Sequence, residues 1–84
     1  MKITFKLYAS LTEYLPPEAR RDNCITLEVA EDATIATIIE PLGMPPKLVH
    51  LVLVNGVYVP PEARATRTFD EGDVLAIWPP IAGG

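Results

Sequence analysis

The chain is 84 residues long and 49% of them are hydrophobic, which suits one small domain with its own core rather than a deep substrate cleft. Eleven acidic and seven basic residues give a net charge of -4, and because no basic stripe is present, we expect no binding to nucleic acid. The single cysteine, Cys24, excludes an intramolecular disulfide and is typical of a reducing compartment. No apolar stretch is long enough for a signal peptide or a membrane span. We therefore expect a soluble cytoplasmic protein whose partners are other proteins.

The first third of the chain predicts two strands joined by a short helical turn. Residues 2–8 alternate between polar and apolar side chains, which is the pattern of a half-buried strand. Residues 10–15 carry apolar side chains at helical spacing, and residues 25–29 alternate again as a second strand. Cys24 stands at the start of that second strand, where we expect a small buried hydrophobic residue rather than a nucleophile.

One principal helix is predicted in the middle of the chain. Thr34 is the expected N-cap, because its side-chain oxygen can accept a hydrogen bond from the first helical turn. Pro41 lacks a backbone N–H and should end the helix near Glu40, and Gly43 is a plausible left-handed exit. The predicted helix has one apolar stripe, made of Ile35, Ile38, Ile39 and Leu42.

The last third of the chain predicts a hairpin, a turn and a final strand. Apolar runs flank Asn55-Gly56, the pair favoured in a two-residue type I′ hairpin turn. The acidic segment 70–73 could supply paired carboxylates, but it surrounds a glycine, and local hydrogen bonding in a tight turn is the favoured interpretation. Strand-like residues 74–78 follow. Five strands and one helix predict an α+β domain over residues 1–78, with residues 79–84 as an extended tail.

Conventional catalytic and cofactor motifs are missing from the sequence. His50 has no second histidine or cysteine nearby, so we expect it at the surface or at a strand end and predict no metal site. There is no glycine-rich phosphate loop for ATP. We therefore predict that the chain is not an enzyme and holds no cofactor.

Pro-Pro-Glu-Ala-Arg occurs twice, at residues 16–20 and 60–64. The repeat is either a duplicated binding motif or a favourable first helical turn with proline at its start. Because the flanking residues do not match, the turn is the favoured interpretation.

The chain ends in Pro79-Pro80-Ile81-Ala82-Gly83-Gly84. Two glycines leave no side chain beside the terminal carboxylate, so it can enter a narrow active site of another protein. The prolines favour an extended, stiff geometry, and six residues reach at most roughly 20 Å. A frayed terminus without a function is the alternative.

The ending from Gly72-Asp73 through the hydrophobic strand, Pro79-Pro80 and Gly83-Gly84 resembles the MoaD/ThiS family of ubiquitin-like sulfur carriers, and most closely its MoaD branch, the small subunits of molybdopterin synthase. The resemblance covers nearly the whole chain and is sharpest at this end. The chain departs from the MoaD pattern at Pro41, which interrupts the helix, and at Trp78, where phenylalanine is more common. The resemblance implies a ubiquitin-like β-grasp fold, with a mixed five-stranded sheet, one main helix and a flexible C-terminal Gly-Gly tail.

The resemblance also implies a function and its partners. A MoeB-like, ATP-dependent enzyme would adenylate the Gly84 carboxylate, a sulfur donor protein would convert it to a thiocarboxylate, and a MoaE-like large subunit with the catalytic side chains would use the sulfur to make molybdopterin. Gly83 would give clearance, and Trp78 is the first candidate for docking on an apolar patch of the sheet. Two alternatives stay open, a sulfur carrier for thiamine, cysteine or tungsten-cofactor synthesis and a ubiquitin-like modifier or interaction domain. The remaining tail residues expected to thread the partner's channel are Pro79, Pro80, Ile81 and Ala82.

Overall fold

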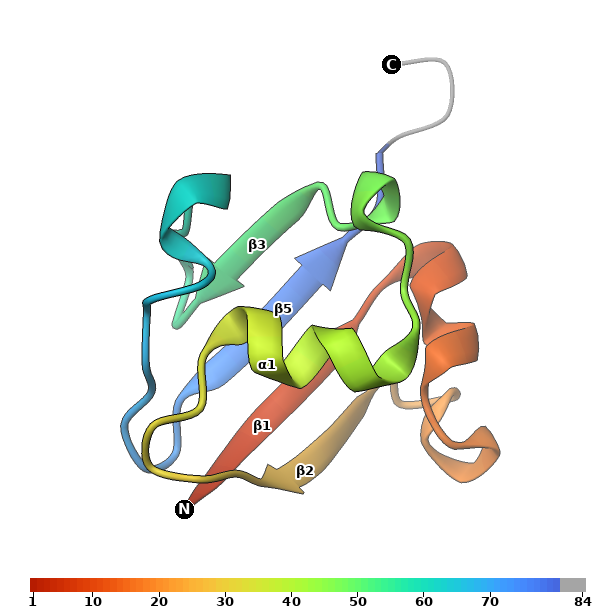
Figure 1. Cartoon of the computed structure of the whole chain (residues 1–84). Coiled ribbons are helices and arrows are strands. Elements are labelled where there is room, and N and C mark those ends of the chain that lie inside the picture. The colour runs from red at the N-terminus through yellow and green to blue at the C-terminus, as the bar shows by residue number, and fades with distance from the viewer. Residues whose placement is uncertain (81–84) are drawn as a thin grey trace.

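The computed structural model describes residues 1–80, and within them five strands form one mixed sheet. The strands lie in the order β2-β1-β5-β3-β4, as Figure 1 shows for the four it labels. β1 and β5 are parallel, and every other neighbouring pair is antiparallel. The prediction of a ubiquitin-like β-grasp fold with a mixed five-stranded sheet is confirmed. The strands are β1 (Lys2–Leu7), β2 (Cys24–Glu28), β3 (Leu51–Val54), β4 (Val57–Tyr58) and β5 (Val74–Trp78).

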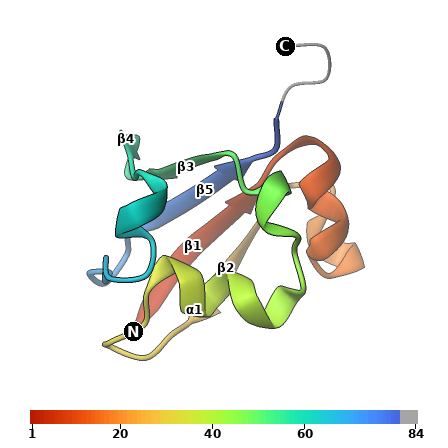
Figure 2. The same cartoon turned by 45° about the horizontal axis from the view of Figure 1, so that its top comes forward.

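The helix α1 (Ile35–Ile39) lies across one face of this sheet (Figures 1 and 2). The backbone N–H of Thr37 donates to the Thr34 hydroxyl (3.3 Å) and that of Thr34 to the Thr37 hydroxyl (2.8 Å), so the predicted N-cap is confirmed as a reciprocal capping box. The α-helix ends where Pro41 forces a 3-10 turn, η3 (Glu40–Leu42), and Gly43 leaves it with a left-handed φ of 71°. The predicted end of the helix is therefore also confirmed.

The core lies between α1 and the sheet. Alternate residues of β1, β3 and β5 point into it, as the period-two pattern of β1 predicts. The 3-10 helix η1 (Ala9–Tyr14) adds Leu11 from one end. Side chains on the opposite face of the sheet, which we call the open face, are half-buried or exposed except for Ala76. The fully buried side chains are Ile3, Phe5, Leu7, Leu11, Ile35, Val52, Val54, Leu75 and Ile77.

A hydrogen-bond network centred on the buried Asp73 carboxylate joins the β3–β4 turn to the start of β5. Asn55 and Gly56 have φ values of 52° and 81°, which confirms the predicted type I′ turn. The Asn55 amide donates to Asp73 Oδ1 (2.8 Å) and its oxygen accepts from the Val74 N–H (2.8 Å). Asp73 Oδ2 accepts from the Asp70 N–H (2.9 Å), so the turn role predicted for this acidic segment is confirmed. That backbone bond in particular, together with the Asn55 side chain and the charge of Arg67, lowers the pKa of Asp73 against the opposing effect of burial.

The two Pro-Pro-Glu-Ala-Arg segments form the same local structure. Each makes a short 3-10 helix with proline at its start, η2 (Pro17–Ala19) and η5 (Pro61–Ala63). In each, the arginine Nε donates to the carbonyl five residues earlier, from Arg20 to Leu15 (3.0 Å) and from Arg64 to Val59 (3.4 Å). The interpretation as a turn-forming segment is therefore confirmed.

One expectation about the core is wrong. Cys24 is half-buried on the open face, opposite Lys6, and does not belong to the core. β2 lies at the edge of the sheet, so an open-face side chain on this strand has a neighbouring strand on one side alone. The strand pattern correctly placed Ile25 and Leu27 toward the core, and the adjacent position necessarily points to the other face.

Candidate functional site

The segment that leads into the predicted tail is held firmly up to Trp78. β5 is an interior strand, paired with β1 on one side and β3 on the other. The Tyr8 N–H donates to the Ile77 carbonyl (3.1 Å), and the His50 N–H donates to the Trp78 carbonyl (3.1 Å). His50 is exposed directly before β3, as predicted. The backbone is therefore fixed on both sides until the tail begins.

The predicted tail begins immediately after this anchored strand. Pro79 is half-buried and Pro80 is exposed, and neither belongs to a strand or helix. Of the predicted site residues, Trp78, Pro79 and Pro80 lie within the described residues. The other four, Ile81, Ala82, Gly83 and Gly84, lie outside the described residues.

Trp78 stacks on Tyr8 at the root of the tail. The ring centroids are 4.0 Å apart and the ring planes differ by 5°. Both side chains are half-buried, so each ring keeps surface in contact with solvent. Because Leu7 is paired with Ile77, the next residues along the two parallel strands, Tyr8 and Trp78, meet on the open face. The stack supplies a pre-ordered, partly exposed aromatic surface.

Apolar side chains continue from this stack across the open face. Leu51 is opposite Trp78, and Leu53 lies between Ala76 on one side and Tyr58 on the other. Tyr58 is 52% exposed, one of the two large hydrophobic residues with the most exposure in residues 1–80. Such a contiguous apolar surface on a sheet face is typical of a protein-binding site. We call it the open-face patch, made of Tyr8, Leu51, Leu53, Tyr58, Ala76 and Trp78.

The sequence predicts Trp78 as a docking residue on an apolar patch but does not indicate its neighbours in the open-face patch. β3 reads Leu-Val-Leu-Val, so both of its faces are apolar, whereas β1 carries polar residues on its open face. That contrast is the signal that could have pointed to Leu51 and Leu53. Tyr8 could not have been found this way, because its place beside Trp78 depends on the parallel pairing of β1 with β5.

Within residues 1–80 there is no group of three His, Cys, Asp or Glu side chains placed to hold a metal ion. In that part of the chain no helix has the length and apolar character needed to cross a membrane.

Comparison with known proteins identifies the family. The family model described as Mut7-C ubiquitin matches residues 1–82. The chain is a member of the Mut7-C ubiquitin family. None of the curated proteins compared with it matches.

Solved structures with the same fold include archaeal and bacterial proteins. The solution structure of the Haloferax volcanii HVO 2177 protein has a TM-score of 0.75 and 25% identity, covering 100% of this chain and 87% of that one. SAMP1 from Haloferax volcanii has a TM-score of 0.69 and 22% identity, with both chains covered completely. One chain of the complex of subunits 1 and 2 of the molybdopterin-converting factor from Helicobacter pylori 26695 has a TM-score of 0.60 and 15% identity, again with complete coverage of both. The resemblance to ubiquitin-like β-grasp proteins is thus confirmed for this Mut7-C ubiquitin protein at the level of family and fold.

Proposed function

We propose that this Mut7-C ubiquitin protein is a sulfur carrier that receives sulfur on the Gly84 carboxylate and donates it in molybdopterin biosynthesis. The observation that carries the proposal is the open-face patch at the root of the tail. A firmly paired strand leads into the tail, and a stacked aromatic pair beside that root offers a partner protein a docking surface. Docking there would deliver the tail to an active site of the same partner.

The proposal divides the chain into two parts. In it, residues 1–78 act as the body that the partner holds and residues 79–84 act as the arm. A tethered reactive group reaches its target at a high effective concentration, provided that the body is held by the partner. The arm needs no catalytic side chain of its own, and in our proposal the partner supplies those.

The chemistry needs an activated carboxylate. An adenylating enzyme transfers AMP from ATP to the Gly84 carboxylate and releases pyrophosphate. The outer sulfur of a persulfide then attacks the carbonyl carbon, and AMP leaves. A thiol reduces the resulting acyl disulfide, so that a thiocarboxylate and an ordinary disulfide are formed. The thiocarboxylate sulfur is the nucleophile that attacks the pterin precursor and is transferred to it.

The proposed partner for sulfur donation is a MoaE-like large synthase subunit. The similar Helicobacter pylori chain comes from a complex of subunits 1 and 2 of the molybdopterin-converting factor, which supports a partner of this kind. The other proposed partners are a MoeB-like adenylating enzyme and a sulfur donor protein.

Intact mass spectrometry tests the carrier chemistry directly. The untagged protein, purified from its own cells, is incubated with ATP, a persulfide donor, a thiol and the host adenylating enzyme. We expect the exchange of one oxygen for sulfur, mapped to Gly84, and no exchange in a variant that lacks Gly84. The mass before incubation also reports whether Gly84 is the last residue of the protein, as the chemistry requires. A longer natural protein, or no exchange with an enzyme that is active on another carrier, would overturn the proposal.

Docking is tested with one variant on the patch and one away from it. Trp78→Ala removes the larger ring of the Tyr8–Trp78 stack, and we expect at least about 30-fold weaker binding to the large subunit, the loss typical of a buried aromatic contact. Lys2→Ala is the matched control, because Lys2 is exposed on the open face at the end of β1 that lies away from Trp78. Equal binding by both variants would show that the partner docks elsewhere.

A ubiquitin-like modifier is the second candidate, favoured by the structural similarity to SAMP1, which a second crystal structure describes as small archaeal modifier protein 1. In this case the activated carboxylate is attacked by a lysine amine of another protein. Detection, in digests of the cell's proteins, of peptides whose lysine side chain is joined to the Gly84 carboxylate would establish the modifier function. The two functions share the activation step and differ in the nucleophile that follows.

A further inference from the structure

Among the strands of residues 1–80, β2 lies at the edge of the sheet, and the backbone groups on its outer side pair with no other strand there. Val29 and Met1 exchange hydrogen bonds at one end of the β1–β2 pair, and the Leu7 N–H donates to the Asn23 carbonyl at the other. Because bonded residues alternate along an antiparallel pair, the N–H and C=O groups of the odd-numbered residues of β2 face β1. Those of Cys24, Thr26 and Glu28 therefore face away from the sheet. β2 contains no proline or lysine, the residues with which edge strands commonly block further pairing.

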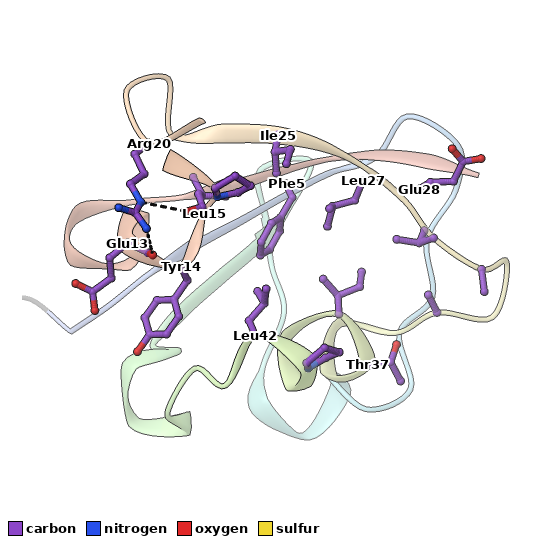
Figure 3. Close-up of a pocket in the computed structure, with 16 residues that line it drawn as sticks. Phe5, Glu13, Tyr14, Leu15, Arg20, Ile25, Leu27, Glu28, Thr37 and Leu42 are labelled. Carbon is purple, nitrogen blue, oxygen red and sulfur yellow. Dashed lines mark hydrogen bonds between the residues drawn. The ribbon is translucent and has the colours of Figure 1, made fainter. Parts of the chain in front are cut away.

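An apolar groove of about 750 Å³ runs beside this edge, between β2 and the segment around α1. Figure 3 shows Ile25 and Leu27 of β2 facing Leu42 across it, with Tyr14 toward one end and Thr37 toward the other. The edge at β2 thus combines outward-facing backbone hydrogen-bonding groups with aliphatic side chains on the face that lines the groove. A protein strand satisfies both, because it supplies N–H and C=O groups and alternating side chains.

The charges at the two ends of β2 are opposite. Arg20, Arg21 and Asp22 precede the strand and together carry a charge of +1, whereas Glu31 and Asp32 follow it and carry -2, all five exposed. Two of the Arg20 guanidinium nitrogens donate to the carbonyls of Leu15 and Glu13, which holds this cation at its end of the groove (Figure 3). An antiparallel copy of the same segment brings the basic end of each strand to the acidic end of the other. β2 is therefore self-complementary in charge as well as in backbone.

We propose that β2 pairs antiparallel with β2 of a second copy of this chain, with the two-fold axis at Thr26. In this register Thr26 is opposite Thr26 of the second copy, and Cys24 is opposite Glu28. Each such pair exchanges two backbone hydrogen bonds, because these are the residues whose N–H and C=O groups face outward. The sheet then continues through the axis from one copy into the other.

Both faces of the new strand pair are compatible with this register. On the groove side Ile25 lies beside Leu27 of the second copy, so aliphatic side chains meet where each groove opens at the edge. On the open face, Glu28 of one copy lies next to Cys24 of the other, whose partner on β1 is Lys6. Cysteine is short, so the lysine can reach the carboxylate. β1 separates β2 from β5, which leaves the open-face patch free for another protein.

The dimer is expected to be weak. A single pair of five-residue strands is smaller than a standard interface of about 1,600 Å². We therefore expect dissociation constants between about 10 µM and 1 mM, the range of weak complexes. Sedimentation equilibrium of the full chain over this concentration range measures the association.

Two substitutions at Thr26 test the edge. Thr26→Pro removes an outward N–H that β1 does not use, and edge strands accept proline in this orientation. We expect association to fall at least about 10-fold, because two hydrogen bonds at the axis are lost in the dimer and the proline ring obstructs the approach. Thr26→Val keeps the N–H and is the matched control that should associate like the unchanged protein. The proposal is overturned if the unchanged protein is monomeric at every concentration, or if both variants associate equally. If such a monomer binds unrelated extended peptides, the edge belongs to a different partner.

Charge and cross-linking variants keep the test decisive if Thr26→Pro does not fold. Arg21→Glu should weaken association, and Arg21→Glu combined with Glu31→Arg should restore it, because the two ends then exchange signs. In a Cys24→Ser background, Thr26→Cys should form a disulfide dimer on oxidation, since Cα atoms of such a pair lie about 5.5 Å apart. The unchanged protein is the control, because the two Cys24 residues are out of register with each other. Equal cross-linking through Cys24, or no rescue by the double charge variant, contradicts this register.

Discussion

Asp73→Asn is expected to destabilise the protein by about 2–3 kcal/mol. One charge-assisted hydrogen bond is lost, and the NH2 group of the introduced asparagine faces another hydrogen-bond donor. Asp73 is 7% exposed, and its two oxygens accept from the Asn55 amide (2.8 Å) and the Asp70 N–H (2.9 Å). Asparagine keeps one acceptor oxygen, so its NH2 group must face one of these two donors. A loss of this size is a large share of the stability of so small a domain.

The matched control is Asp70→Asn. The Asp70 side chain is exposed, and the network uses its backbone N–H, which this substitution keeps. We expect a change within about 0.5 kcal/mol, as for most surface substitutions. Urea unfolding followed by circular dichroism at neutral pH measures both variants. An Asp73→Asn loss no larger than that of Asp70→Asn would refute the network as a source of stability.

The loss of stability caused by Asp73→Asn is expected to depend on pH. The pKa of Asp73 is lowered from its ordinary value of 3.8 in the folded protein, so the carboxylate stabilises the fold above that pH. As the pH falls below 3.8 through the folded pKa, this contribution is lost. The stability difference between the unchanged protein and Asp73→Asn should therefore narrow in acid. A difference that stays constant down to about pH 2.5 would contradict the lowered pKa.

Two further predictions are checked by the same unfolding measurements. Phe5→Ala should cost about 3–5 kcal/mol because the ring is 2% exposed, whereas Ile38→Ala should cost less than about 2 kcal/mol because Ile38 is half-buried beside the groove. Equal losses would show that Ile38 is as tightly packed as the core. Gly56→Ala should cost about 1–2 kcal/mol from the left-handed φ of 81° alone, since no atom lies within 4 Å of the added Cβ. No loss would mean that the turn changes its conformation.

The features of the fold that depend on residues close together in the sequence could be predicted from the sequence. The cap at Thr34, the helix end at Pro41 and the turn at Asn55-Gly56 are each set by contacts within a few residues, and the alternation of β1 is visible in the residue order itself. A capping hydroxyl or a missing N–H acts on the adjacent turn whatever the rest of the chain does. The Gly-Gly ending is also a property of the sequence alone, and the role of Gly84 stays a prediction.

The open-face patch and the edge at β2 were decided by the tertiary structure. Tyr8 and Trp78 stack because β1 and β5 pair as parallel neighbours, and nothing local in either segment specifies that pairing. β3 is apolar on both faces, so its own pattern does not say which face the core covers. Cys24 was expected in the core but is half-buried on the open face, where the order of strands leaves β2 at the edge with a neighbouring strand on one side alone. Strand order is settled by which distant apolar faces bury one another, and that free energy belongs to the whole assembled sheet and to no single segment.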